Sequence, residues 1–193
     1  MNNTPLFLFC GRSASGKTTI AEMLTDQYGY SQVYSYTTRA PRSEEEIGHI
    51  FVDTETFNNL GELAAYTYYN SAHYGTTFEQ LQTSDIYVID VPGIESLLKN
   101  YNKINRHICI IYFSSTVYTR INRMINRGSS DTEVISRLLQ DEKDDWYKKL
   151  DQLVWHYVNI EQTNVDLYRI DANGSQQNVL EQVLYYMNKY EEK

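Results

Sequence analysis

Short apolar runs alternate with segments of helical periodicity along most of the chain. The runs at 6–10, 86–90, 107–113 and 167–171 are typical of buried strands, and the segments between them repeat apolar residues at helical spacing. Such alternation favours a mostly parallel sheet that is covered by helices on both faces. The predicted fold class is therefore α/β, with three layers.

The segment 33–83 departs from this pattern because its elements are shorter. We expect strands at 31–36, 49–52 and 66–69, a brief helix that is N-capped by Asp53, and a glycine turn within 71–77. The acidic run at 44–46 and a proline before it indicate a solvated loop. We interpret 33–83 as a lobe for substrate inserted into one domain.

A pair of helices with a short linker is predicted after the strand at 107–113. The first helix spans about 117–127 and ends at Gly128, and the spacing of Ser130 and Glu133 is that of a capping box opening the second. Because arginines lie on both helices, the region 127–137 is predicted to be a mobile lid. The core of the single domain, 1–193, is then predicted to comprise 1–32, 84–126 and 138–193.

Residues 11–18 read G-R-S-A-S-G-K-T and match the phosphate-cradling pattern G-x-x-x-x-G-K-[ST] between a strand and a helix. Gly11 and Gly16 allow backbone conformations that a side chain would forbid. Lys17 is placed to reach the outer phosphates of a nucleotide, and the Thr18 hydroxyl to ligate Mg²⁺. The alternative is an ordinary glycine-containing turn. The predicted ATP-binding residues are Gly11, Ser13, Ala14, Ser15, Gly16, Lys17, Thr18 and Thr19.

Composition narrows the class of protein. A net charge of −8 over 193 residues argues against a broad nucleic-acid surface, so phosphate has to be met by local arginine clusters. Two cysteines in apolar runs indicate a reducing compartment, and no run approaches the ~20 apolar residues that span a bilayer. The start of the chain lacks signal-peptide features, so we expect a cytoplasmic protein without a membrane partner. No metal site of protein ligands alone is expected from the histidines, which are His49, His73, His107 and His156.

Four motifs in this order resemble the guanylate kinase family of nucleoside monophosphate kinases. They are G-R-S-A-S-G-K-T-T, S-Y-T-T-R-A-P-R, H-Y-G-T-T, and an R-G segment followed by an arginine before Leu138. Together they cover about residues 5–140. The resemblance implies a P-loop kinase fold, ATP with Mg²⁺ as phosphoryl donor, and GMP or dGMP as acceptor.

The resemblance also implies roles for individual residues. Arg39, Arg42 and Tyr74 match residues that hold the acceptor phosphate, for which a guanidinium fork is well suited. Charge on the transferred phosphoryl group would be neutralised by the residues that match the family's catalytic set, Lys17, Arg39, Arg127 and Arg137. Guanine contacts are implied for Ser35, Thr76 and Asp90. The plainer alternatives are solvent-facing arginines and a tyrosine that only packs.

Some positions depart from the family. Ala65 stands where the family has a glutamate that contacts guanine, and His49, which we retain as a substrate-binding residue, stands where it has a phosphate-binding tyrosine. The segment before Leu167 is longer, and we expect its Trp146 and Trp155 to pack in the core. A kinase for another nucleotide or a sugar phosphate, and a non-catalytic module that binds proteins, remain alternatives. The intact phosphate loop argues against the module.

Overall fold

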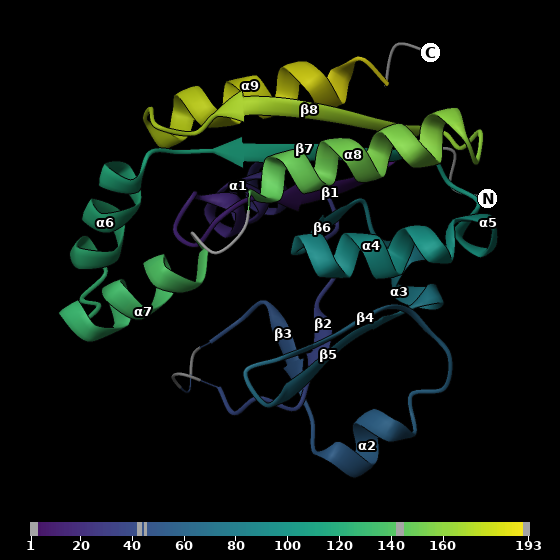
Figure 1. The fold of residues 1–193 in the computed structure, drawn as a ribbon, viewed down its shortest axis with the longest axis horizontal. Coiled ribbons are helices and arrows are strands. Elements are labelled where there is room, and N and C mark those ends of the chain that lie inside the picture. Colours follow the sequence, from purple (N-terminus) through teal and green to yellow (C-terminus); the bar gives the residue numbers. More distant parts are fainter. Residues whose placement is uncertain (1–3, 42–43, 45, 142–144, 191–193) are drawn as a thin grey trace.

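A computed structural model describes residues 4–41, 44, 46–141 and 145–190 (Figure 1). The strands are β1 (Leu6–Cys10), β2 (Ser35–Thr37), β3 (His49–Phe51), β4 (Leu63–Tyr69), β5 (Ala72–Thr77), β6 (Ile86–Val88), β7 (Ile108–Ser114) and β8 (Val165–Asp171). The helices are α1 (Lys17–Tyr28), α2 (Thr54–Asn58), α3 (Phe78–Thr83), α4 (Val91–Lys99), α5 (Tyr101–Ile104), α6 (Val117–Asn126), α7 (Asp131–Asp141), α8 (Trp146–Asn159) and α9 (Gln176–Asn188).

The larger sheet has the order β6-β1-β7-β8, and each neighbouring pair is parallel. Alternate side chains of β1 enter opposite cores: Leu6 and Leu8 pack with α4 and α8, whereas Phe7 and Phe9 pack with α1 and α9. Both faces of the sheet are therefore buried under helices, which is why its strands read as continuous apolar runs. The predicted three-layer α/β P-loop kinase fold with a mostly parallel sheet is confirmed.

A second, smaller sheet lies below the first in Figure 1, with the order β3-β2-β5-β4. It is joined to α4 by hydrogen bonds from the Tyr66 amide to Ser96 Oγ (3.0 Å) and from Asn100 Nδ2 to the Ala64 carbonyl (3.1 Å). These bonds hold β4 against the helix that begins directly after Asp90. The small sheet is thereby fixed opposite the carboxyl end of β6, where ligands bind in such folds.

The expected glycine turn within 71–77 is wrong, because residues Ala72–Thr77 form strand β5. The turn lies one step earlier, at Asn70 and Ser71, which have positive φ angles of 48° and 60°. Gly75 is required by packing: a Cβ there would lie 2.7 Å from Leu63 Cδ1 and 2.9 Å from Phe57 Cζ. A glycine in a strand pattern can therefore mark close approach of another segment.

The later helices agree with the sequence in part. Ser130 and Glu133 form the expected capping box at the start of α7, with their side chains bonded to each other's backbone N–H groups. Helix α8 was not predicted. It buries Leu150 and Val154 against the larger sheet and leaves Trp155 61% exposed, so the expected core position of Trp155 is wrong. In the part of the chain described, no helix has the length and apolar character to cross a bilayer.

Candidate active site

The loop between β1 and α1 has a shape that only glycine permits at two points. Gly11 has φ 150°, and a Cβ on it would lie 2.6 Å from the carbonyl oxygen of Phe113. Gly16 has φ 99° and forms the N-cap of α1. Because α1 begins at Lys17, its positive N-terminal end faces the loop that the glycines shape.

Lys17 folds back onto this loop. Its Nζ donates to the carbonyls of Gly11 (2.7 Å) and Arg12 (2.9 Å) and to Ser15 Oγ (3.2 Å). Burial lowers the pKa of the Lys17 ammonium, and the nearby carboxylate of Asp141 opposes that shift. The ammonium is thus held in the loop by acceptors that phosphate oxygens can replace.

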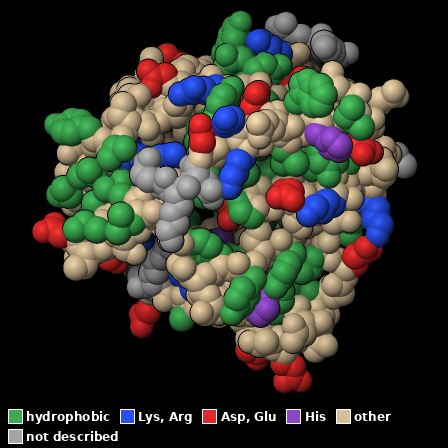
Figure 2. Space-filling model, in the orientation of Figure 1, with side chains coloured by type: hydrophobic (Ala, Val, Ile, Leu, Met, Phe, Trp, Pro, Cys, Tyr) green, Lys and Arg blue, Asp and Glu red, His purple; other side chains and the backbone are tan. Residues whose placement is uncertain are grey.

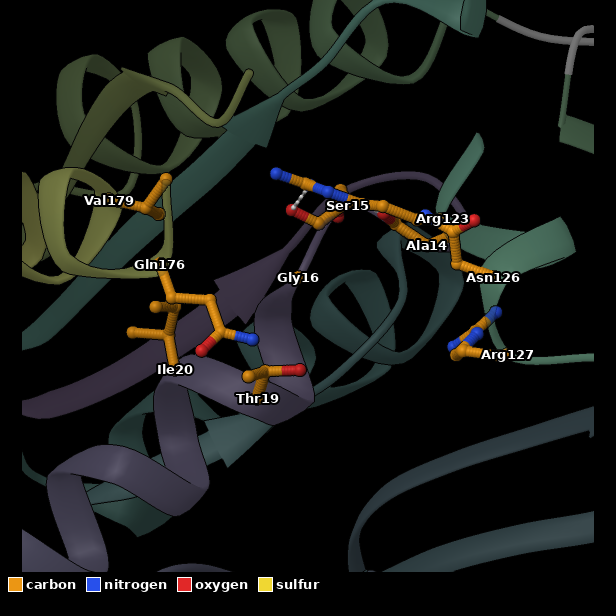
Figure 3. A pocket seen from close by; sticks show the side chains of 10 residues that line it. All are labelled: Ala14, Ser15, Gly16, Thr19, Ile20, Arg123, Asn126, Arg127, Gln176 and Val179. Atoms are coloured by element: carbon orange, nitrogen blue, oxygen red, sulfur yellow. Dashed lines mark hydrogen bonds between the residues drawn. The ribbon is translucent and has the colours of Figure 1, made fainter. Parts of the chain in front are cut away.

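A cavity of about 290 Å³ lies on one side of the loop. Figure 3 shows Arg123, Asn126 and Arg127 on one flank and Gln176 and Val179 on the other, with the loop between them. The predicted ATP-binding residues in its lining are Ala14, Ser15, Gly16 and Thr19.

Arg123 is a residue of this cavity whose role sequence reasoning missed. Its Nη1 donates to the carbonyls of Ser15 (3.0 Å) and Ala14 (3.4 Å), and its Nη2 to that of Gly174 (3.2 Å). It therefore braces the outer turn of the phosphate loop. The helical spacing of Arg120, Arg123 and Arg127 was a signal that could have found it, because it places the arginines on one side of α6.

A second cavity, of about 340 Å³, connects the two sheets. It reaches Gly11, Ser13 and Lys17 of the loop, and Figure 2 shows a hollow in the middle of this face with Lys and Arg side chains above it. The residues predicted to bind the acceptor that line it are Ser35, Arg39, His49, Tyr74 and Asp90. Arg42, also predicted to bind the acceptor, lies outside the described residues.

Arg39 carries two hydrogen bonds to one carboxylate. Its Nη2 and Nη1 donate to the oxygens of Glu46 at 2.8 and 3.1 Å, and this pairing, followed by the charge of Glu46, raises the pKa of Arg39. Its Nε is buried and has no hydrogen-bond partner among the residues described. A planar fork that binds a carboxylate in this way also matches the geometry of phosphate oxygens.

The polar residues at the far end of the cavity are partly engaged with one another. Ser35 Oγ lies 2.9 Å from His49 Nδ1, and the ring of His49 meets that of Tyr74 edge-on at 5.7 Å. Thr76 is fully buried, donates to the Tyr87 hydroxyl (2.7 Å) and does not line the cavity. The structure therefore brings Ser35 and His49 to the cavity but not Thr76.

Asp90 follows β6 and caps α4, where its Oδ1 accepts from the Gly93 amide at 2.7 Å. Burial raises the pKa of Asp90, against the lowering effects of that hydrogen bond and of the Lys17 charge. A partly buried carboxylate at this place can accept hydrogen bonds from a base with N–H donors. The N-cap role alone also accounts for an Asp here.

The arginines of the expected lid lie near different cavities. Arg127 follows α6 and lines the cavity of Figure 3. Arg137 lies on α7 near Tyr69 of the acceptor-side cavity: burial raises the pKa of Tyr69, as does the charge of Asp141, and Arg137 lowers it. Sequence reasoning gave no role to Asp141 and placed Trp146 only in the core, yet both line this cavity.

Comparison with known proteins agrees with this geometry. No family model matches the chain. Three curated relatives are each named guanylate kinase: that of Oleidesulfovibrio alaskensis is 26% identical over 83% of this chain and 81% of its own length. That of Fusobacterium nucleatum is 25% identical (88% and 96%), and that of Mycoplasma genitalium 26% (83% and 71%).

Solved structures show the same fold. The guanylate kinase of Anaplasma phagocytophilum superposes with a TM-score of 0.58 at 18% identity, covering 96% of this chain and 85% of that one. A sugar kinase of Janibacter sp. gives 0.50 at 17% identity, covering 96% and 95%. At these identities the likeness concerns the fold alone. Relatives that match over four-fifths of its sequence, together with a glycine-shaped phosphate loop facing a second sheet, identify this chain as a nucleoside monophosphate kinase that is similar to the guanylate kinases.

Proposed function

We propose that this kinase transfers the γ-phosphoryl group of ATP to GMP or dGMP. The observation that carries the proposal is the cavity of about 340 Å³, because Lys17 of the phosphate loop, Arg39 of the small-sheet side and Asp90 all line it. Phosphoryl transfer depends mostly on alignment of the two phosphates and on neutralisation of their charge. A single cavity that joins the phosphate loop to the guanidinium group of Arg39 and the carboxylate of Asp90 meets both needs.

On the donor side, the ATP phosphates occupy the loop 11–18 and the nucleoside the cavity of Figure 3. Lys17 exchanges its contacts with the loop carbonyls for the outer phosphates. The lid, 127–137, contributes Arg127 and Arg137, whose charges stabilise the transferred group when the lid closes over the lobe, 33–83. Closure also excludes water, which would otherwise accept the phosphoryl group.

The residues present fit Mg²⁺ held between protein and nucleotide. Within the described ranges, no group of three or more His, Cys, Asp or Glu side chains is placed to hold a metal. Mg²⁺ in kinases needs only one or two protein oxygens, because phosphates and waters complete its shell. The exposed Thr18 hydroxyl in the first turn of α1 is such an oxygen. When bound, the metal would neutralise charge on the ATP phosphates.

The acceptor phosphate takes the place of Glu46 on Arg39. The buried Nε of Arg39 is one further donor for it, and Tyr74, which also raises the pKa of Arg39, lies beside the same guanidinium. Arg42 and His49 are proposed to bind the same phosphate. Exchange of a carboxylate for a phosphate keeps Arg39 paired throughout, so no uncompensated charge is left in the cavity.

The base is proposed to be guanine because Asp90 offers a carboxylate to its N1 and N2 donors, with Ser35 beside it. Thr76 was expected as a further contact, but its hydroxyl donates to that of Tyr87 and it does not line the cavity. Ala65 lines the cavity with a methyl group that accepts no hydrogen bond. The absence of a second acceptor costs about 1–3 kcal/mol of discrimination, so a different acceptor is the second candidate.

The test is ADP release from ATP and Mg²⁺ with a panel of ribo- and deoxyribonucleoside monophosphates and a sugar phosphate. Preference for GMP or dGMP supports the proposal. Preference for another acceptor supports the second candidate, and the difference in acceptor specificity is then attributed to Ala65 in the wall of the cavity. Calorimetry with ATP alone separates both from a non-catalytic binding module, for which we expect no ATP binding.

A further inference from the structure

Asp141, the last residue of lid helix α7, makes contacts that reach well beyond that helix. Its side chain is 6% exposed and pairs with the fully buried Arg120 of α6 at 2.7 Å. Its Oδ2 also accepts from the Ser13 amide (2.9 Å), and its Oδ1 lies 3.2 Å from Ser13 Oγ, which donates to it. One buried carboxylate thus connects the lid helix, α6 and the phosphate loop.

These bonds do more than neutralise Arg120. An ion pair alone would need one face of the carboxylate, yet both oxygens are bonded to Ser13, the third residue of the loop. The amide of Ser13 is therefore turned toward Asp141, and this fixes the direction of the neighbouring peptide groups in the loop. The same charge acts on Lys17, where it opposes the lowering of the pKa by burial.

Asp141 and Arg137 lie four residues apart on helix α7. Residues four apart share one face of a helix, so the face that carries Asp141 to the phosphate loop carries Arg137 toward the same region. The charges of both residues act on Tyr69, which lines the acceptor-side cavity together with Asp141. Arg137 therefore lies one helical turn from Asp141, on the side of α7 whose charge acts on Tyr69 of the acceptor-side cavity.

We propose that Asp141 is a positioning residue that ties the end of the lid helix to the phosphate loop. Through Ser13 it sets the conformation of the loop for ATP, and through α7 it sets the position of Arg137 for the transfer step. This inference rests on the proposed phosphotransfer but not on the identity of the acceptor base. Arg120 serves as the counter-charge of this buried carboxylate.

The test uses two double variants that lack the buried ion pair. Asp141→Asn or Asp141→Leu removes the carboxylate that pairs with the buried Arg120, so each is combined with Arg120→Met, which removes that charge at similar length. In the first variant the Asn oxygen still accepts from the Ser13 amide and its nitrogen can donate to Ser13 Oγ. In the second, Leu offers nothing to Ser13. Both are expected to fold with similar melting temperatures.

We expect the Asn double variant to keep kcat and ATP affinity within about threefold of wild type, and the Leu double variant to lose about 10–100-fold in kcat/KM. Equal activity of the two double variants at equal stability would overturn the proposal, because a purely structural pair is replaced equally well in both. Asp151→Asn, an exposed carboxylate on α8 outside the lid, is the control and should leave activity unchanged.

A second readout concerns Arg137. Arg137→Met should lower kcat in the Asn background as much as in wild type, but far less in the Leu background, where Arg137 is no longer positioned. Equal losses in both backgrounds contradict the link to the lid. Calorimetry with ATP alone keeps the test independent of the proposed acceptor: weaker ATP binding in the Leu than in the Asn double variant supports the Ser13 contact even if GMP is not phosphorylated, and equal binding contradicts it.

Discussion

Arg39, which lines the acceptor-side cavity, is joined to Glu46 by two hydrogen bonds, with N–O distances of 2.8 and 3.1 Å. Their side chains are 18% and 16% exposed, so the pair is largely shielded from water. The acceptor phosphate has to displace Glu46 from the fork that it is proposed to use. The carboxylate is therefore a built-in competitor of the substrate.

Glu46→Gln should remove this competition. We expect the KM for the acceptor nucleotide to fall about three- to tenfold, which is the value of one partly shielded ion pair, with kcat little changed. The measurement is the initial rate against acceptor concentration at saturating ATP. Glu44→Gln, on an exposed neighbour, is the matched control. A KM that rises in Glu46→Gln would mean that Glu46 holds Arg39 in place for the substrate instead.

Lys17→Ala should abolish turnover and leave the fold intact. The ammonium makes three contacts within its own loop, and no described strand or helix of the core depends on them. We expect kcat to fall on the order of a thousandfold, since the charge stabilises the transition state of transfer. Melting temperature and circular dichroism report the fold, and replacement of an exposed lysine of α8, Lys148→Ala, is the control. Substantial turnover in purified Lys17→Ala would count against the mechanism.

The pH dependence of kcat/KM for the acceptor should show the titration of the Asp90 carboxyl group. Burial raises the pKa of this carboxyl group, so it takes up a proton at a pH above the ordinary value of about 3.9 for aspartate. Its ability to accept from the base is present above that raised pKa and is lost as the pH falls through it. We therefore expect kcat/KM for the acceptor to decline on the acid side.

Asp90→Asn separates this decline from titration of the nucleotide phosphate. Asn remains a good N-cap for α4, so the helix should persist. The part of the acid limb that belongs to Asp90 should vanish in the variant, while the part due to the substrate phosphate stays. Identical acid limbs in the two proteins would show that Asp90 acts only as the helix cap.

Gly75→Ala should destabilise the small sheet. The added Cβ would lie 2.7 Å from Leu63 Cδ1 and 2.9 Å from Phe57 Cζ, so these side chains have to move. We expect the free energy of unfolding to fall by about 1–3 kcal/mol, as is usual for overpacking. Denaturant titration measures it. An unchanged midpoint would mean that the packing under β4 adapts without cost.

The parts of the fold that depend on local chemistry could be predicted from the sequence. The spacing of Gly11, Gly16 and Lys17 specifies a loop shape by backbone freedom alone, and the continuous apolar runs of β1 and β7 follow from burial on both faces. The capping box of Ser130 and Glu133 is equally local.

The remainder depends on contacts between distant segments. The hydrogen bond from the Ser13 amide to Asp141 joins residues that are 128 positions apart. It produces no pattern of apolar and polar residues, so it could not be predicted from the sequence of either segment alone. Gly75 was interpreted as part of a turn because the sequence does not show why a glycine is needed. A glycine can be needed for a positive φ angle or, as here, for close packing against Leu63 and Phe57. Thr76 was assigned to the base by resemblance, whereas its hydroxyl is committed to Tyr87 behind the cavity wall.

The most direct test of the central claim follows the phosphoryl group itself. The protein is incubated with Mg²⁺, GMP and ATP labelled at its γ-phosphate, and the nucleotides are separated. We expect the label in the β-phosphate of GDP, with Lys17→Ala transferring none. If the label stays in ATP or appears only as inorganic phosphate, although ATP binds the loop, the chain does not phosphorylate GMP and the proposed acceptor is wrong.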